Sequence, residues 1–284
     1  TRAPPHEQRA QKRLALKPHF IVIGAQKCGT TTICRELERH PQIALFPNKE
    51  THFFSFRYGR GLEWYEGLFD GLDAEVVGEG SPSYTTGEFS ALAAERIALD
   101  VPDVKLIFIA RHPLHRLPSG YVQLFDSDLN PGTFEEELKR SPKLIPASCF
   151  DARLDEYRTR FPSESLHVMF LEDLKADYSG ELARLFDFLG VDPSFALSPP
   201  LAPQNTRAHK RADGRFLRQL RKRRSFLSLN WRLPRPLKKA LIPLLRKKIS
   251  IDVSWTPALH AYAVEQVRED AERFLESNGK PLDY

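Results

Sequence analysis

The sequence has no apolar run near the roughly 18 residues that a membrane-spanning helix requires. It also has few cysteines: Cys28, Cys34 and Cys149 are scattered, odd in number and outside the spacings of zinc sites. This pattern argues against a disulfide framework and is typical of reduced thiols in a cytosolic protein. The first residues lack the apolar core of a signal peptide, so no feature of the chain predicts secretion.

Charge is distributed unevenly behind a formal net charge of +5. Residues 207–248 hold sixteen of the 42 lysines and arginines but one of the 37 acids, so the remainder has 26 basic and 36 acidic residues, a net of −10. This basic segment favours a polyanion, an anionic cofactor or an anionic membrane as partner, and a solvated helical face explains it equally well. Nucleic acid is a poor candidate, since the segment has few aromatics and no usual binding motif.

The stretch HFIVIGAQKCGTTT, residues 19–32, reads as a strand, an anion-binding loop and the start of a helix. Backbone N–H groups and the dipole at a helix N-terminus favour an anion there. Gly24 and Gly29 have the spacing of the P-loop motif G-x-x-x-x-G-K-[ST]. However, Thr30 stands at the lysine position, and Lys27 lies two residues before Gly29. The displaced lysine argues against an ordinary nucleoside triphosphatase.

Strand and helix patterns alternate after residue 18. Lys105–Ala110 is a continuous apolar run, typical of a parallel strand buried on both faces. Further patterns predict strands at 43–46, 76–80 and 166–170, and helices at 61–69, 90–99, 181–189 and 257–275. The alternation predicts an α/β fold: a three-layer α/β/α sandwich with a central parallel sheet and a helical C-terminal third. We expect a flexible arm over residues 1–18 and a single domain over 19–284.

Ligands of such folds bind beyond the carboxyl ends of the strands. Residues 24–32, the loop after 43–46, residues 79–84 and residues 111–119 are therefore expected around one cleft. These segments carry a resemblance to sulfotransferases that use 3′-phosphoadenosine 5′-phosphosulfate (PAPS), above all the heparan sulfate glucosaminyl sulfotransferases and their bacterial relatives. The matching pieces, in order, are FIVIGAQKCGTTT, HPQIALFPNKETHFF, YGRGLEWYEGLF, EGSPSY and KLIFIARHPLHRLPSGY.

The resemblance implies a donor site with a P-loop-like architecture. It gives Lys27 the bridging region of PAPS, where an ammonium stabilises the departing phosphate, and it lets the backbone approach closely at Gly29. Arg111 and Ser119 are implied to hold the 3′-phosphate, although Pro118 is expected to restrict or kink the helix there. The other implied donor-binding residues are Cys28, Thr30, Thr31 and Thr32 in the loop, and Arg207, Lys210 and Arg211 in the basic segment. Helix capping is the alternative role for the threonines.

The acceptor side is implied by two further segments. Glu50 matches the position of a catalytic carboxylate that takes the acceptor proton, and His52 matches a histidine that orients the acceptor or shares that proton. Glu79, Ser83 and Tyr84 are expected to line the acceptor site. The related 3-O-sulfotransferases carry a lysine after this glutamate, where this chain has Gly80. Either the acceptor differs, or a basic residue from elsewhere compensates.

The resemblance thus implies in-line sulfuryl transfer from PAPS to a hydroxyl or amine, on a carbohydrate or glycolipid, without a metal. A P-loop kinase or NTPase is one alternative, but it needs a lysine after Gly29 and a magnesium-binding aspartate nearby. A non-catalytic polyanion-binding module is another. Residues 215–248 mix apolar and basic side chains, which also fits contact with an anionic membrane. The lack of an anchor and of paired cysteines favours a bacterial cytoplasm, with a Golgi lumen as the alternative.

Overall fold

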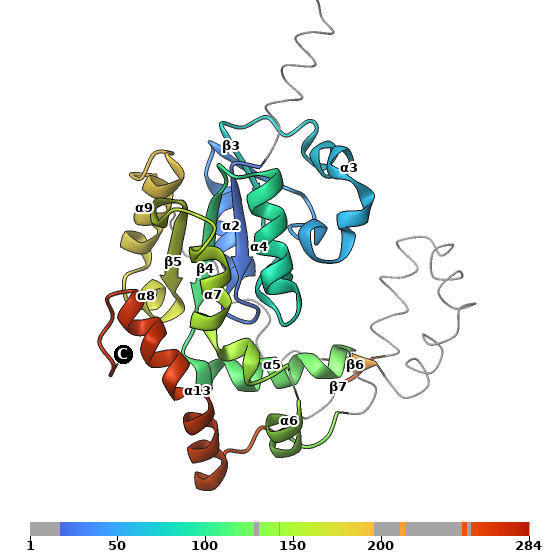
Figure 1. Cartoon of the computed structure of the whole chain (residues 1–284), viewed down its shortest axis with the longest axis vertical. Coiled ribbons are helices and arrows are strands. Elements are labelled where there is room, and N and C mark those ends of the chain that lie inside the picture. Colours follow the sequence, from blue (N-terminus) through green and yellow to red (C-terminus); the bar gives the residue numbers. More distant parts are fainter. Residues whose placement is uncertain are drawn as a thin grey trace, which may run out of the picture.

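The centre of the fold is a sheet of parallel strands in the order β2-β3-β1-β4-β5 (Figure 1). The computed structural model describes residues 18–127, 131–141, 143–195, 211–213, 246–248 and 251–283. The strands are β1 (Phe20–Gly24), β2 (Ile43–Leu45), β3 (Val76–Glu79), β4 (Lys105–Ala110) and β5 (Leu166–Phe170). All five carry the apolar patterns predicted for them, and the parallel sheet confirms the predicted fold class.

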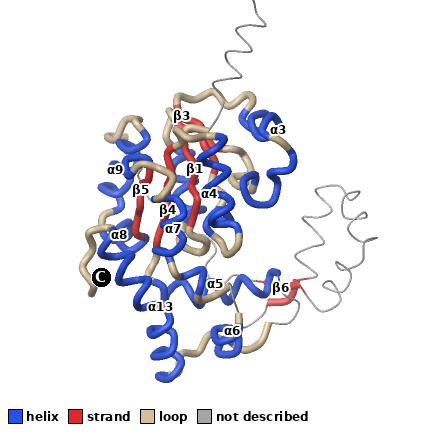
Figure 2. Tube along the Cα trace, in the orientation of Figure 1, coloured by secondary structure: helices blue, strands red, loops and turns tan. Residues whose placement is uncertain are grey.

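Helices pack on both faces of this sheet, which makes three layers (Figure 2). The chain moves one way along the sheet between β1 and β2 and the other way between β3 and β4, so right-handed connections put their helices on opposite faces. On one face α4, α7 and α13 contact one another in series, and α2 lies behind the sheet in Figure 1. The helices are α2 (Thr30–Arg39), α3 (Leu62–Glu66), α4 (Phe89–Asp100), α5 (Pro113–Ser127), α6 (Phe134–Arg140), α7 (Phe150–Arg158), α8 (Leu171–Ala176), α9 (Tyr178–Leu189) and α13 (Pro257–Ser277).

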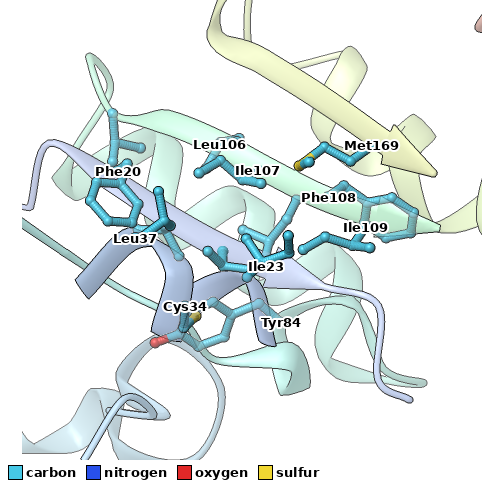
Figure 3. Packing of buried hydrophobic residues seen from close by; sticks show 14 of the residues in the cluster. Phe20, Ile23, Cys34, Leu37, Tyr84, Leu106, Ile107, Phe108, Ile109 and Met169 are labelled. Carbon is cyan, nitrogen blue, oxygen red and sulfur yellow. The ribbon is translucent and has the colours of Figure 1, made fainter. Parts of the chain in front are cut away.

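The core lies along β1 and β4, whose apolar side chains are buried on both faces (Figure 3). Phe108 of β4 meets Phe150 of α7 and Phe274 of α13 with ring centroids 5.7 and 6.1 Å apart. The pairing of β1 with β4 is regular from Phe20 to Val22 and shifts in register before Gly24. The backbone therefore leaves the sheet at Gly24, where the predicted anion-binding loop begins.

Several elements differ from expectation. The helix predicted at 61–69 divides into α3 and a 3₁₀ turn, Gly67–Phe69. Pro118 does not end α5, which continues as one helix to Ser127. Helices α6, α7 and α8 were not predicted, because each is short. Residues 1–17 and 214–245 lie outside the described residues, so the flexible arm and the single domain stay predictions.

Candidate active site

The loops that follow the strands are tied together at the carboxyl edge of the sheet. The loop after β1 is joined to the end of β4, because Arg111 Nη1 donates a hydrogen bond to the carbonyl of Lys27 at 3.4 Å. The segment after β3 is joined to the loop after β2, because the N–H of Gly80 donates to the carbonyl of Lys49 at 2.9 Å. The predicted donor and acceptor segments thus share one edge.

The loop after β1, the predicted donor loop, has a backbone conformation compatible with an anion site. Lys27 and Gly29 both adopt left-handed backbone, with φ of 70° and 100°. Gly29 is the N-cap of α2, and no side chain caps this helix, which removes capping as an explanation of the threonines. A Cβ at position 29 would also lie 3.1 Å from Leu171 Cδ1. The first turn of α2 has no acidic residue, so no carboxylate of that turn competes for the positive end of the helix.

The environment of Cys28 differs from that expected of a donor-binding residue. Its side chain is fully buried and its N–H donates to the carbonyl of Ala25 at 3.2 Å. Burial raises the pKa of its thiol to about 12, an effect larger than the opposing charges of Arg116 and Arg111. The buried side chain of Cys28 therefore gives no support to its predicted contact with the donor, and its thiol is an inert part of the core.

Arg116 supports the same loop from below, a role that the sequence alone did not reveal. It is 1% exposed, and its Nε donates to the carbonyl of Gln26 at 2.9 Å. Its Nη1 donates to Ser148 Oγ at 3.0 Å and to the carbonyl of Leu144 at 3.3 Å. A buried guanidinium thus fixes the donor loop against α5.

Arg111 directly follows β4, and Ser119 lies within α5. Both are partly exposed. Among the described residues no carboxylate pairs with Arg111, and its Nε is buried without a hydrogen-bond partner. A buried donor without a partner is costly unless a ligand completes it. An arginine fork in this state suits a phosphate.

Glu50 lies in the loop after β2 and is held by two neighbours. Its Oε1 accepts from Lys49 Nζ at 2.5 Å, and its Oε2 accepts from His52 Nε2 at 3.1 Å. Partial burial raises the pKa of the Glu50 carboxyl, but the hydrogen bonds from His52 and Lys49 and the charge of Lys49 outweigh it and lower the pKa to about 2. Glu50 is therefore an ionised carboxylate at neutral pH, partly open to solvent.

His52 is fixed on both ring nitrogens. Nε2 donates to Glu50, since a carboxylate only accepts, and Nδ1 lies 2.8 Å from Ser83 Oγ. Ser83 in turn lies 2.8 Å from Ser55 Oγ. Ser83 is buried and contacts His52, so it orients the imidazole and is not exposed at the predicted acceptor surface. Phe56 beside it is 60% exposed, with its ring centroid 5.6 Å from that of His52.

Glu79 and Tyr84 differ from their predicted place on the acceptor surface, because both side chains are fully buried. Four side chains donate hydrogen bonds to the Glu79 carboxylate: Thr51, Tyr65, Ser81 and Tyr84. The shortest come from Ser81 and Tyr84, each at 2.6 Å. The prediction that these two residues line the acceptor site is corrected to a supporting role: they hold Thr51, next to Glu50.

The space beside Gly80 accounts for the missing lysine. A Cβ at this position would lie 2.7 Å from Cys34 Sγ and 3.6 Å from Lys49 Cγ. The side chain of Lys49 therefore lies next to Gly80, the position at which the related enzymes carry their lysine. This position of Lys49 is compatible with the second alternative, a compensating basic residue, which stays a prediction.

Other predicted residues receive less support. Arg207 and Lys210 lie outside the described residues. Arg211 begins β6 (Arg211–Asp213), which pairs antiparallel with β7 (Arg246–Lys248), so the two ends of the basic segment are brought together.

Within the described parts of the chain, no group of three His, Cys, Asp or Glu could hold a metal ion.

Comparison with known proteins identifies relatives. Residues 17–211 match the family described as Sulfotransferase domain. The chain is 34% identical over 185 residues to human heparan sulfate glucosamine 3-O-sulfotransferase 3B1, covering 61% of this chain and 46% of that protein. It is 35% identical over 113 residues to the membrane-associated sulfotransferase kil1 of Dictyostelium discoideum, covering 38% and 23%. The chain spans about half the length of the heparan sulfate enzymes it matches.

A solved structure shares the fold. The crystal structure of a sulfotransferase from Alicyclobacillus acidocaldarius matches with a TM-score of 0.67 at 22% sequence identity, covering 94% of this chain and 98% of that one. At this sequence identity the match supports a shared fold and nothing more.

The predicted bacterial cytoplasmic location is wrong. The sequence relatives are heparan sulfate sulfotransferases of human and mouse and a protein named as membrane-associated. The small number of unpaired cysteines was not sufficient evidence to predict the cellular compartment. Of the helices that the structure describes, none has the length and apolar character to cross a membrane.

Proposed function

The chain belongs to the sulfotransferase domain family, and on this premise we propose that it transfers a sulfuryl group from PAPS to a hydroxyl or amine of a glycan. One observation carries the proposal: an uncapped helix start behind Lys27 and Gly29 shares a sheet edge with the ionised Glu50. Sulfuryl transfer needs an anion-binding donor site and an aligned base, and this edge carries a candidate for each.

The donor half of the site is cationic. The ammonium of Lys27, the N-terminus of α2 with Thr30, Thr31 and Thr32, and the guanidinium of Arg111 offer donors to phosphate and sulfate oxygens. The buried Nε of Arg111, which no described residue satisfies, supports its assignment to the 3′-phosphate. We assign Ser119 to the same phosphate.

The reaction then needs no further catalyst from the protein. As the acceptor oxygen or nitrogen forms its bond to sulfur, its proton passes to a carboxylate oxygen of Glu50, which His52 holds in place. The bond between sulfur and the bridging oxygen breaks, and its electron pair stays on the phosphate of the leaving 3′-phosphoadenosine 5′-phosphate. Lys27 stabilises that developing charge. Direct neutralisation by side chains makes a metal unnecessary in this scheme.

A glycan acceptor is supported by two features. Several relatives are named as heparan sulfate glucosamine 3-O-sulfotransferases, so their names give a glycan as acceptor. In this chain, Phe56 presents an exposed ring next to His52. An exposed aromatic ring is a suitable surface for the apolar face of a sugar.

A kinase is less compatible with the geometry. Of the strands on either side of β1, β4 is followed by Arg111 and β3 ends at Glu79, whose oxygens are already engaged by buried hydroxyl groups. Neither position offers a carboxylate to magnesium. Calorimetric titration with 3′-phosphoadenosine 5′-phosphate, and separately with ATP and magnesium, tests the choice. Tight, metal-independent binding of the bisphosphate is expected, and preference for ATP with magnesium would refute the proposal.

Contact of the basic segment with an anionic membrane stays a prediction. Most of residues 207–248 lie outside the described residues, so composition alone supports it. Co-sedimentation with phosphatidylserine vesicles at low salt should recover the protein, and its absence from the pellet would end this hypothesis.

A further inference from the structure

Arg116 is a cation enclosed in the protein, and the hydrogen bonds that hold it go to neutral groups. Its side chain is 1% exposed. The guanidinium donates to the carbonyls of Gln26 and Leu144, at 2.9 and 3.3 Å, and to Ser148 Oγ at 3.0 Å. A buried charge is costly unless an opposite charge balances it. These oxygens accept its N–H groups and leave its charge unbalanced.

The ionisable groups around Arg116 do not balance this charge either. Burial lowers the pKa of the Arg116 guanidinium, and the described neighbours that also act on that pKa are Cys28, Arg111 and Cys149. Burial raises the pKa of both thiols, so they are neutral at neutral pH. Arg111 has the same sign as Arg116. Among these neighbours there is therefore no anion in the free protein.

Arg116 lies directly beneath the loop after β1. The carbonyl that accepts from its Nε belongs to the residue before Lys27, and a trans peptide turns the following N–H the opposite way, so the N–H of Lys27 points away from Arg116. The pKa of the Cys28 thiol, which burial raises, is lowered by three cations: Arg116, Arg111 and Lys27. One carboxylate, Glu172, opposes them. Positive charge is thus in excess beneath this loop.

We propose that Arg116 is a buried counter-charge of the donor, so that the anionic groups of the nucleotide bound on the other side of the loop balance its guanidinium. This inference rests on the proposed function and adds a residue to its donor site. Arg116 is a positioning residue, since it acts on the donor through the loop and through its charge, without contact. Salt screens a buried charge much less than an exposed one, so its effect persists at physiological ionic strength.

The test gives Arg116 an internal anion and measures whether the donor site loses affinity. Ser148→Asp places a carboxylate beside Arg116 Nη1 and leaves the contact of Arg116 with Gln26 in place. Ser148→Asn is the matched control, because asparagine has the size and shape of aspartate without its charge. Both are titrated calorimetrically with 3′-phosphoadenosine 5′-phosphate.

We expect Ser148→Asp to bind this bisphosphate about tenfold or more weakly than Ser148→Asn, the effect of one unit charge acting over roughly 10 Å in a protein interior. A role confined to holding the loop predicts the reverse. Aspartate forms a stronger hydrogen bond with arginine than asparagine does, so it would hold Arg116 and the loop more firmly. Equal affinity of the two variants, or tighter binding by Ser148→Asp, would overturn the inference while leaving the proposed function intact.

A second pair of variants decides the question if the Ser148 variants do not fold, as judged by circular dichroism. Arg116→Lys keeps the charge and loses the planar fork, whereas Arg116→Gln keeps two N–H donors and loses the charge. Tighter binding of the bisphosphate by Arg116→Lys than by Arg116→Gln supports the inference. Equal binding, or tighter binding by Arg116→Gln, overturns it.

A simpler anion separates the inference from the proposed function. If wild type does not bind 3′-phosphoadenosine 5′-phosphate, the proposed function fails, and inorganic pyrophosphate becomes the probe of the same loop. Weaker binding of pyrophosphate by Ser148→Asp than by Ser148→Asn then still supports a buried counter-charge. The same binding by both variants, or no binding to wild type, overturns it.

Discussion

The buried carboxylate of Glu79 gives a sharp prediction about stability. Tyr84 donates to Glu79 Oε1 at 2.6 Å, and its side chain is fully buried. Tyr84→Phe removes this one hydroxyl and little volume. Tyr157→Phe is the matched control, since the Tyr157 hydroxyl is equally buried but donates at 2.7 Å to a neutral acceptor, the carbonyl of Tyr84.

The two substitutions should differ in size because one acceptor is charged. A hydrogen bond to a charged group contributes about 1.5–3 kcal/mol and one between neutral groups about 0.5–1.5 kcal/mol. We therefore expect Tyr84→Phe to lower the free energy of unfolding by about 2 kcal/mol and Tyr157→Phe by about 1 kcal/mol. Urea denaturation followed by tryptophan fluorescence measures both.

The loss in Tyr84→Phe should also depend on pH. Burial raises the pKa of Glu79 above its ordinary value of 4.5, while hydrogen bonds from Ser81, Tyr84 and Thr51 oppose that rise. The native state therefore holds the proton more tightly than the unfolded state, and the Glu79 contribution to stability falls as pH rises from 4.5 to the native pKa. Losing the Tyr84 hydroxyl raises that native pKa further.

The stability gap between wild type and Tyr84→Phe should thus be small at acidic pH, where Glu79 is protonated in both. It should widen as pH rises, and Tyr157→Phe should show no such trend. Equal losses for the two variants at every pH would refute the claim that Tyr84 stabilises the ionised form of Glu79.

Other expectations follow from the site. Glu50→Gln should lower kcat about a hundredfold or more, the loss expected for a general base; near-normal turnover in a sulfate-transfer assay would remove that role from Glu50. Arg111→Ala should mainly raise the KM for PAPS, and a change confined to kcat would contradict phosphate binding. Cys28 should resist alkylation by iodoacetamide in the native state, because its buried thiol stays protonated; rapid labelling seen by mass spectrometry would contradict its burial. Excess chelator should leave turnover unchanged, whereas a loss restored by magnesium would show a metal requirement.

Much of the fold was readable from local patterns. The apolar runs at Phe20–Gly24 and Lys105–Ala110 predicted the strands that form the core, and a parallel sheet followed from their alternation with helices. Helix α7 was missed, although Phe150, Leu154 and Tyr157 have helical spacing and are buried. These three apolar residues are separated by charged residues and span only two turns, so the pattern was too short to predict a helix.

The candidate site was predictable in part. Lys27, Gly29 and Arg111 follow strands directly, so the rule that ligands bind at the carboxyl edge was enough to bring them together. Glu79 ends β3 and Tyr84 follows that strand, yet the side chains of both are buried in the core. Sequence placed their backbone correctly and gave no information on the direction of their side chains.

The sequence by itself determined the strands, the glycine-containing turn after β1 and the order of the segments around the site, because these depend on apolar periodicity and glycine positions within a few neighbouring residues. Only the tertiary structure decided which polar groups face solvent and which partners they have. Thr51 meets Glu79 across 28 positions of the chain, and Arg116 meets Gln26 across 90. Burial and charge pairing depend on such distant contacts, so the inert thiol of Cys28 and the enclosed carboxylate of Glu79 emerge only when the sheet brings those segments together.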